Sequence, residues 1–154
     1  MKNSNLETYC EFYERLGLES LGEIHSLFDS SAIFKDPFNF VQGHDAIEKI
    51  FKKLLSDYPK TSFKVKDKQQ DGEVAFMTWS FMPNRDKDLT IEGASRVQFN
   101  SIGKIIEHRD YWDSASELFA KIPVLRTPFR LLLNKLQASR ADQIQKQITA
   151  FKAD

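Results

Sequence analysis

Apolar residues in the first third of the chain recur every three or four positions, which is the spacing of one helix face. A capping-box pattern at Ser4 opens the first stripe and Gly17 closes it. A second capping box at Ser20 predicts a short helix that stops near residues 29–31. The first stripe consists of Leu6, Tyr9, Cys10, Tyr13 and Leu16.

A third helix is predicted between Gly43 and Pro59, where the lysines stay off a continuous apolar stripe. Before it, residues 32–35 have the character of a short strand that runs into Asp36-Pro37. The stripe consists of Ile47, Ile50, Phe51, Leu54, Leu55 and Tyr58.

From Lys60 onward the apolar positions alternate with polar ones, as in a strand with one buried face. Asp71-Gly72 is a hairpin-turn pair, and the near-continuous apolar run 73–82 predicts a strand buried on both faces. Segments 89–99 and 104–112 complete an antiparallel meander. Helices followed by a meander predict an α+β fold.

The last part of the chain has weaker patterns. An amphipathic segment, 118–136, is broken by prolines, which favours a lid over a membrane-surface contact. Beyond it the sequence turns polar. We therefore predict one domain over residues 1–138 and a C-terminal helical tail over 139–154.

Composition narrows the function classes. The 154-residue chain has 22 basic and 22 acidic residues, so no global charge favours nucleic acid, and no apolar run is long enough for stable membrane insertion. Cys10 is the single cysteine, which excludes a disulfide within one chain. With no signal-peptide pattern at the N-terminus, we expect a cytoplasmic protein. The 13 phenylalanines suit a cavity lined by aromatic rings.

The order of these elements resembles the nuclear transport factor 2-like superfamily, which includes SnoaL-like and ketosteroid-isomerase-like domains. The resemblance covers about the first 115 residues and rests on segment 28–37, Gly43, segment 97–100, segment 103–106 and Tyr111-Trp112. It implies a cone-shaped roll, with N-terminal helices packed on a curved, mostly antiparallel sheet that encloses an apolar pocket. It also implies a homodimer paired through the outer face of the sheet, where Glu92, Arg96 and Gln98 form a polar row.

Ketosteroid isomerases carry their general base where this chain has Asp36, so the resemblance implies that role here. The alternative is an Asp-Pro turn that only positions the chain. The family's oxyanion donors do not carry over, because Ser95 stands in place of the second acid. Phe12, between Tyr9 and Tyr13, is the nearest match to the family's tyrosine. A literal steroid isomerase is therefore not expected.

On the last strand, His108, Asp110 and Trp112 share one face because alternate residues point the same way. Matching Tyr111-Trp112 to the superfamily directs this face into the pocket, where a histidine and an aspartate are costly to bury unless paired. The alternative is that the face is solvated.

These observations predict a cofactor-independent acid–base enzyme of the isomerase, cyclase, dehydratase or hydrolase type, acting on a small hydrophobic molecule. Asp36 would be the base, and His108 and Asp110 would relay or donate a proton. The alternative is a non-catalytic small-ligand-binding or dimerisation domain. The residues expected to contact the ligand are Tyr13, Phe40, Trp79, Ser95 and Trp112.

No cofactor and no metal are expected. Asp36, His108 and Asp110 have suitable ligand types for a metal, but their spacing does not argue for one. His25 is predicted to be a core or rim histidine. His44 is predicted to belong to the start of the third helix, not to a ligand set.

Overall fold

The computed structural model describes residues 5–114. The chain divides into two units, Met1–Asp113 and Ser114–Asp154, and the account below concerns the first. The predicted lid segment, the domain boundary at 138/139 and the C-terminal tail lie outside the described residues.

Three α-helices and one 3₁₀ helix form from the N-terminal stripes: α1 (Asn5–Glu14), the 3₁₀ helix η1 (Leu18–Glu23), α2 (Ile24–Leu27) and α3 (His44–Asp57). The predicted apolar stripe of α1 is buried. The second helical segment begins as a 3₁₀ helix capped by Gly17, so Ser20 lies inside it and not at its start as predicted. The Ser20 hydroxyl accepts from Gly17 N and donates to Gly17 O, both at 2.9 Å.

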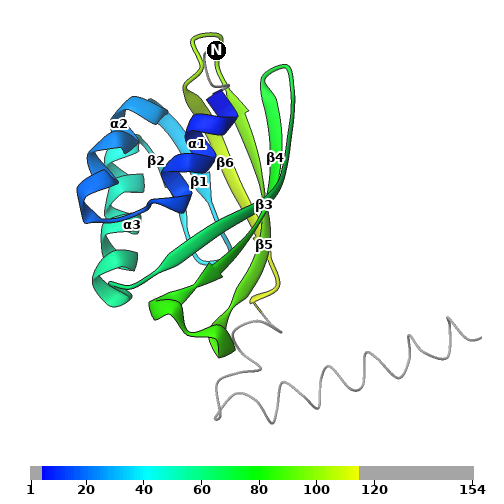
Figure 1. Ribbon diagram of the computed structural model, residues 1–154. Helices are drawn as coiled ribbons and strands as arrows, with labels where there is room; N and C mark the ends of the chain where they lie inside the picture. The colour runs from blue at the N-terminus through cyan, green and yellow to red at the C-terminus, as the bar shows by residue number, and fades with distance from the viewer. Residues whose placement is uncertain (1–4, 115–154) are drawn as a thin grey trace, which may run out of the picture. The chain divides into compact units, whose positions relative to one another are not determined.

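Six strands form one sheet in the order β2-β1-β6-β5-β4-β3 (Figure 1). The last four strands are the predicted meander, and β1 joins it through a parallel pairing with β6. Two short 3₁₀ turns, η2 (Pro83–Arg85) and η3 (Lys87–Leu89), lie between β4 and β5. The strands are β1 (Phe28–Lys35), β2 (Phe40–Gln42), β3 (Ser62–Asp71), β4 (Val74–Met82), β5 (Ile91–Phe99) and β6 (Ile105–Trp112).

The structure differs from the sequence prediction at three strands. β1 begins at Phe28, four residues earlier than expected, because its first residue already pairs with Ile105 of β6. Strand β2 was not predicted. In β4, burial on both faces was wrong: Phe76 is 56% exposed on the outer face, while Ala75 and Met77 are buried on the inner one.

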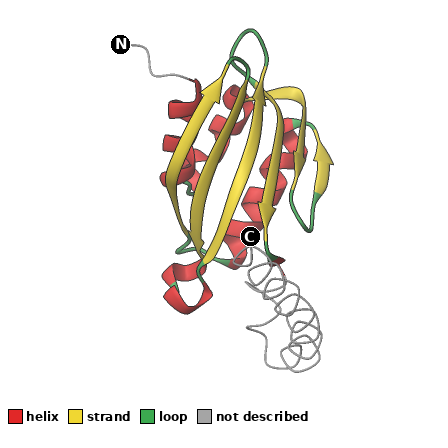
Figure 2. Ribbon diagram, turned by 90° about the vertical axis from the view of Figure 1, so that its right-hand side faces the viewer, coloured by secondary structure: helices red, strands yellow, loops and turns green. Residues whose placement is uncertain are grey.

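The helices cover one face of the sheet, as Figure 2 shows with the strands in front of them. Strand register aligns residues of four strands in one row of this covered face, namely Phe34, His108, Val97 and Ala75. All four are buried. The row places a histidine at the centre of an otherwise apolar core.

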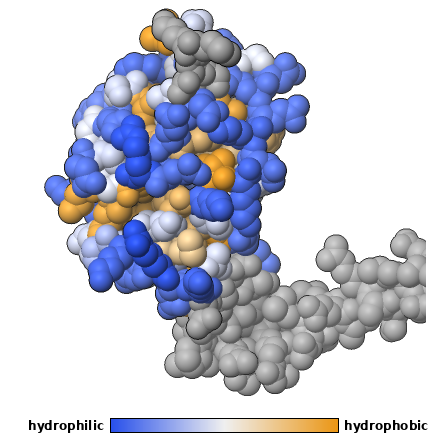
Figure 3. Space-filling view, in the orientation of Figure 1, coloured by the Kyte–Doolittle hydropathy of each residue, from blue (hydrophilic) through white to orange (hydrophobic). Residues whose placement is uncertain are grey.

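The surface seen in Figure 3 is mostly hydrophilic, with separate apolar patches. Among the described residues, no helix has both the length and the apolar character needed to span a bilayer.

Candidate functional site

A buried chain of hydrogen bonds crosses the covered face of the sheet, with the imidazole of His108 at its centre. His108 is 0% exposed. Its Nε2 lies 2.6 Å from Asp110 Oδ1 and its Nδ1 lies 2.8 Å from the Tyr9 hydroxyl. Both ring nitrogens therefore have partners, which removes most of the cost of burying a histidine.

A relay of two donors on β5 and β4 ends at Asp110. The Trp79 indole N–H donates to Ser95 Oγ at 2.7 Å, and the Ser95 hydroxyl donates to Asp110 Oδ1 at 2.5 Å. An indole can only donate, so Ser95 must accept from Trp79 and turn its own proton toward the carboxylate. The register of β5 and β6 sets this contact by placing Ser95 directly opposite Asp110.

The hydrogen bonds of the site run without a break from Trp79 to Tyr9. The Asp110 carboxylate accepts from the Ser95 hydroxyl and shares a second bond with His108 Nε2. The tautomer of His108 sets which ring nitrogen donates, and the Tyr9 hydroxyl is the partner of Nδ1. This arrangement gives each of these polar atoms a partner, and its donors converge on Asp110.

Aromatic rings hold the His108 imidazole in place. Phe34 stacks on it at 5.0 Å between ring centroids with the planes 7° apart, and Tyr13 stacks at 5.9 Å and 21°. Tyr9 meets it edge-on at 5.8 Å. The ring is confined on several sides, so its hydrogen bonds have fixed directions.

The two tyrosines beside His108 stay protonated across the physiological pH range. Burial raises the pKa of both the Tyr9 and Tyr13 phenols well above 10.0, and the negative charge of Asp110 raises it further. Their hydroxyl oxygens lie 3.3 Å apart. Both therefore remain neutral hydrogen-bonding groups next to the histidine.

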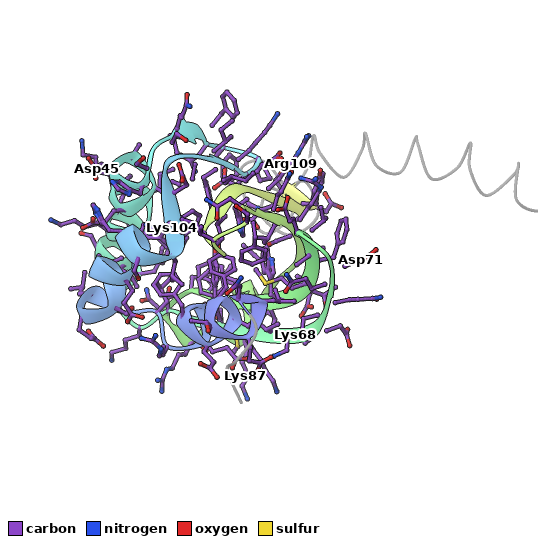
Figure 4. All side chains as sticks on the ribbon, turned by 90° about the horizontal axis from the view of Figure 1, so that it is seen from above. Asp45, Lys68, Asp71, Lys87, Lys104 and Arg109 are labelled. Atoms are coloured by element: carbon purple, nitrogen blue, oxygen red, sulfur yellow. The ribbon has the colours of Figure 1, made fainter. Side chains whose placement is uncertain are left out.

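At its Asp110 end, the hydrogen-bond network reaches a pocket of about 530 Å³, which lies where β1 and β6 end. The Asp110 side chain is 15% exposed, whereas that of His108 is fully buried. Arg109, labelled in Figure 4, precedes Asp110 in the chain and also lines this pocket. The pocket is lined by Lys35, Asp36, Pro37, Arg109, Asp110, Tyr111, Trp112 and Asp113.

Asp36 lines the same pocket, and its carboxylate is already committed to the turn that it begins. Its Oδ1 accepts from Phe38 N at 2.7 Å and Asn39 N at 2.6 Å, and the Asn39 amide donates to both of its oxygens. This is the geometry of an Asx turn. The structure thus brings Asp36 and Asp110 to one pocket. Both oxygens of Asp36 accept hydrogen bonds, whereas the bonds of Asp110 involve Oδ1 alone.

The predicted ligand-contacting residues divide into two groups. Trp112 lines the pocket and meets Phe38 edge-on at 5.4 Å. Tyr13, Trp79 and Ser95 lie in the core around the His108–Asp110 pair. Phe40 is not brought to the pocket: it is 72% exposed on β2, with the Lys35 ammonium 5.6 Å from its ring.

Sequence reasoning did not assign a role to Tyr9, which the structure places in direct contact with His108. Its position on the apolar stripe of α1 predicts burial only. A tyrosine on that stripe, four residues before Tyr13, was the available signal, because a buried hydroxyl needs a partner.

The family comparison identifies a SnoaL-like domain over residues 10–108, about two thirds of the chain. None of the curated proteins matches the sequence.

Solved structures with the same fold align with this chain over most of their own length. A proposed isomerase of the SnoaL-like family from Agrobacterium tumefaciens aligns with a TM-score of 0.61 at 16% identity, over 71% of this chain and 94% of that one. A proposed SnoaL-like polyketide cyclase from Jannaschia sp. CCS1 aligns at 0.62 and 12% identity, over 73% and 87%. A nuclear transport factor 2-like protein of unknown function from Cytophaga hutchinsonii aligns at 0.60 and 17%, over 75% and 97%. These likenesses establish the fold, and the family match over residues 10–108 establishes the SnoaL-like family.

Proposed function

The chain belongs to the SnoaL-like domain family, and we propose that it is a cofactor-independent acid–base enzyme acting on a small hydrophobic carbonyl or enol. Asp110 is the proton-exchanging group and His108 is the residue that positions it. Solved SnoaL-like structures named as a proposed isomerase and a proposed polyketide cyclase support this reaction class.

The observation that carries this proposal is that the hydrogen bonds of Asp110 with Ser95 and His108 both fall on Oδ1. Within the described part of the chain, Oδ2 takes no hydrogen bond, and the residue lines the pocket. A carboxylate that is held through one oxygen presents the other to a substrate. It therefore loses little conformational freedom when the substrate binds.

The reaction that fits this geometry is a proton transfer between two carbons. Asp110 Oδ2 takes a proton from the carbon beside a carbonyl, and the electron pair of that C–H bond moves into an enolate. Where a C=C bond adjoins that carbon, the enolate is a conjugated dienolate, and the same carboxyl group returns the proton to its far carbon. The net change is an isomerisation that consumes no cofactor, with Pro37 and Trp112 as apolar parts of the pocket wall.

Asp36 remains the second candidate for the base, as the superfamily resemblance implies. Its hydrogen bonds to Phe38, Asn39 and the Asn39 side chain would have to be kept or exchanged during the reaction. Asp110 has its supporting bonds on one oxygen only, so we place it first.

The test is exchange of carbon-bound protons with deuterated solvent, followed by NMR over a panel of small hydrophobic ketones and enones. Asp110→Asn should lower the exchange rate of the best compound by about 10²- to 10⁴-fold. Asp113→Asn, which removes one charge from the same pocket, should leave it nearly unchanged. Full activity in Asp110→Asn together with loss in Asp36→Asn would move the role to Asp36. Saturable binding without exchange by the wild type would favour the binding-domain alternative.

A second candidate function is self-association through the outer face of the sheet. Phe76 and Tyr111 are 56% and 48% exposed on that face, beside the Arg96–Glu107 ion pair at 2.8 Å. Exposed aromatic rings beside a polar pair suit an isologous contact. Sedimentation should show a dimer that Phe76→Glu dissociates, and a monomeric wild type at all concentrations would contradict it.

The cytoplasmic location stays a prediction.

A further inference from the structure

Two imidazoles and two carboxylates gather where α2 meets the first turn of α3, away from the pocket. His25 lies on α2, and His44, Asp45 and Glu48 lie on α3. Viewed from above, Figure 4 has Asp45 on the α3 side and Arg109, beside the pocket, on the other. The cluster and the His108–Asp110 site therefore occupy different parts of the molecule.

Two distances in this cluster are close to the edge length of a metal-coordination tetrahedron. Asp45 Oδ1 lies 3.3 Å from His44 Nε2 and 3.6 Å from His25 Nε2. The candidate ligand atoms of these three residues all lie within 4.8 Å of one another. Zinc bonds of about 2.0–2.1 Å to nitrogen and oxygen place tetrahedral ligands about 3.3 Å apart.

We propose that His25, His44, Asp45 and Glu48 form a binding site for a divalent transition metal of the zinc class. Glu48 Oε2 lies 2.5 Å from His25 Nε2, so a hydrogen bond joins the two side chains. A cation would replace the proton of this hydrogen bond and bind both atoms after the carboxylate moves back to ligand distance. Two imidazole nitrogens and two carboxylate oxygens are a ligand set that zinc accepts.

The fold prepares this site in the absence of metal. Gly43 adopts φ = 93°, a conformation that favours glycine, and this turn brings His44 to the first position of α3. The His25 and His44 rings lie 4.2 Å apart between centroids. His44 Nδ1 is buried without a hydrogen-bond partner among the described residues. The other ring nitrogen, Nε2, faces Asp45 and is the one offered to the metal.

Charge and access are also compatible with a cation. The first turn of a helix disfavours positive charge, but Asp45 in that turn and Glu48 just after it offset both this dipole and a divalent ion. Asp45 has a side chain 75% exposed and Glu48 one 33% exposed, so the ion can enter from solvent and the carboxylates can adjust.

Titration of the metal-free full-length protein with Zn²⁺, against a competing chromophoric chelator, tests the site. We expect one equivalent of Zn²⁺ to bind and the apparent Tm to rise with Zn²⁺ concentration. Substitution by Co²⁺ should give the intense visible absorption of tetrahedral coordination. His25→Gln and His44→Gln should each weaken binding by more than about tenfold, and the double variant should abolish it.

The matched control is Asp57→Asn at the other end of α3, where the aspartate pairs with Lys53, and it should bind Zn²⁺ as the wild type does. Asp45→Asn, at an exposed position, tests the site even if a histidine variant fails to fold. Absence of stoichiometric binding by the wild type would overturn the proposal. So would equal Zn²⁺ affinity in the wild type and a folded Asp45→Asn or double-histidine variant.

Discussion

The His108 imidazole and the Asp110 carboxylate, two residues apart on one face of β6, are joined by a 2.6 Å hydrogen bond. One partner is fully buried and the other reaches the pocket. Any change of charge in the pocket therefore acts directly on a ring in the centre of the core. The network around this pair gives predictions that need no knowledge of the substrate.

Tyr9→Phe should destabilise the protein more than Tyr13→Phe. Loss of the Tyr9 hydroxyl leaves His108 Nδ1 buried without its partner, at a cost of about 1–3 kcal/mol in unfolding free energy. Tyr13 loses only a 3.3 Å contact to Tyr9. Both changes remove one oxygen from a buried ring on α1, so each is the control for the other. Urea unfolding measures the difference, and equal losses would contradict the role of the Tyr9–His108 bond.

Ser95→Ala should cost about 1–3 kcal/mol because it leaves the buried Trp79 N–H without an acceptor. In a Trp79→Phe background that donor is absent, so the same substitution should cost less. A double-mutant cycle by urea unfolding should give a coupling of about 0.5–3 kcal/mol. Additive effects would show that the Trp79–Ser95 bond does not stabilise the fold.

Gly93→Ala should destabilise the protein through the ring of Trp79. A methyl group at Gly93 would lie 2.4 Å from two carbons of that ring, and overpacking of this kind costs about 1–3 kcal/mol. Gly22→Ala is the control, because its methyl group would meet nothing within 4 Å. Thermal unfolding should show a lowered Tm for Gly93→Ala alone, and recovery in a Trp79→Phe background would identify the clash.

The free energy of unfolding should fall at alkaline pH, and the first loss should come from ionisation of the single cysteine, Cys10. Burial raises the pKa of the Cys10 thiol from 9.0 to about 11. A raised pKa in the folded state favours the neutral thiol, so its stabilisation is complete below pH 9 and is lost between pH 9 and 11. The loss should reach about 1.4 kcal/mol at pH 10. The raised pKa values of the Tyr9 and Tyr13 phenols add a further loss above pH 10.

Urea unfolding at pH 8, 9 and 10 measures this slope, with Cys10→Ala as the comparison. The variant should be less stable at pH 8 because it leaves a small cavity, yet lose less stability than the wild type as the pH rises. Parallel pH profiles for the two proteins would contradict a contribution from the thiol.

Periodic burial explains why much of the fold was predictable. The third helix lies within the predicted bounds, at His44–Asp57, because one apolar stripe covers its whole length. The alternation in 89–99 predicted β5 and its buried residues, including Ile91, Val97 and Phe99. Asp71-Gly72 marked the turn between β3 and β4 because Gly72 takes φ = 57° there.

The remainder depends on pairings between distant segments, which leave no local pattern. Residues 29–31 are polar and indicated the end of a helix, yet they belong to β1, which pairs with β6. The chain from Trp79 through Ser95 to Asp110 needs the register of three strands. The Tyr9–His108 contact needs α1 laid across the sheet. The sequence could suggest that His108 and Asp110 act together, but not which hydroxyl completes the set.

The position of β6 between β1 and β5 has a consequence for how the protein is made. β6 is the last described strand in the sequence, yet it occupies the interior of the sheet. During synthesis, the α1–α3 helices and β1 leave the ribosome before the strand that joins them to the meander exists. Their apolar faces stay exposed until β1 pairs with β6, a contact between distant parts of the sequence that is slow to form. Chaperones can bind this exposed apolar surface in the meantime. A nascent chain stalled just before residue 105 would hold every other described helix and strand and still lack both His108 and the strand that joins the two parts of the sheet.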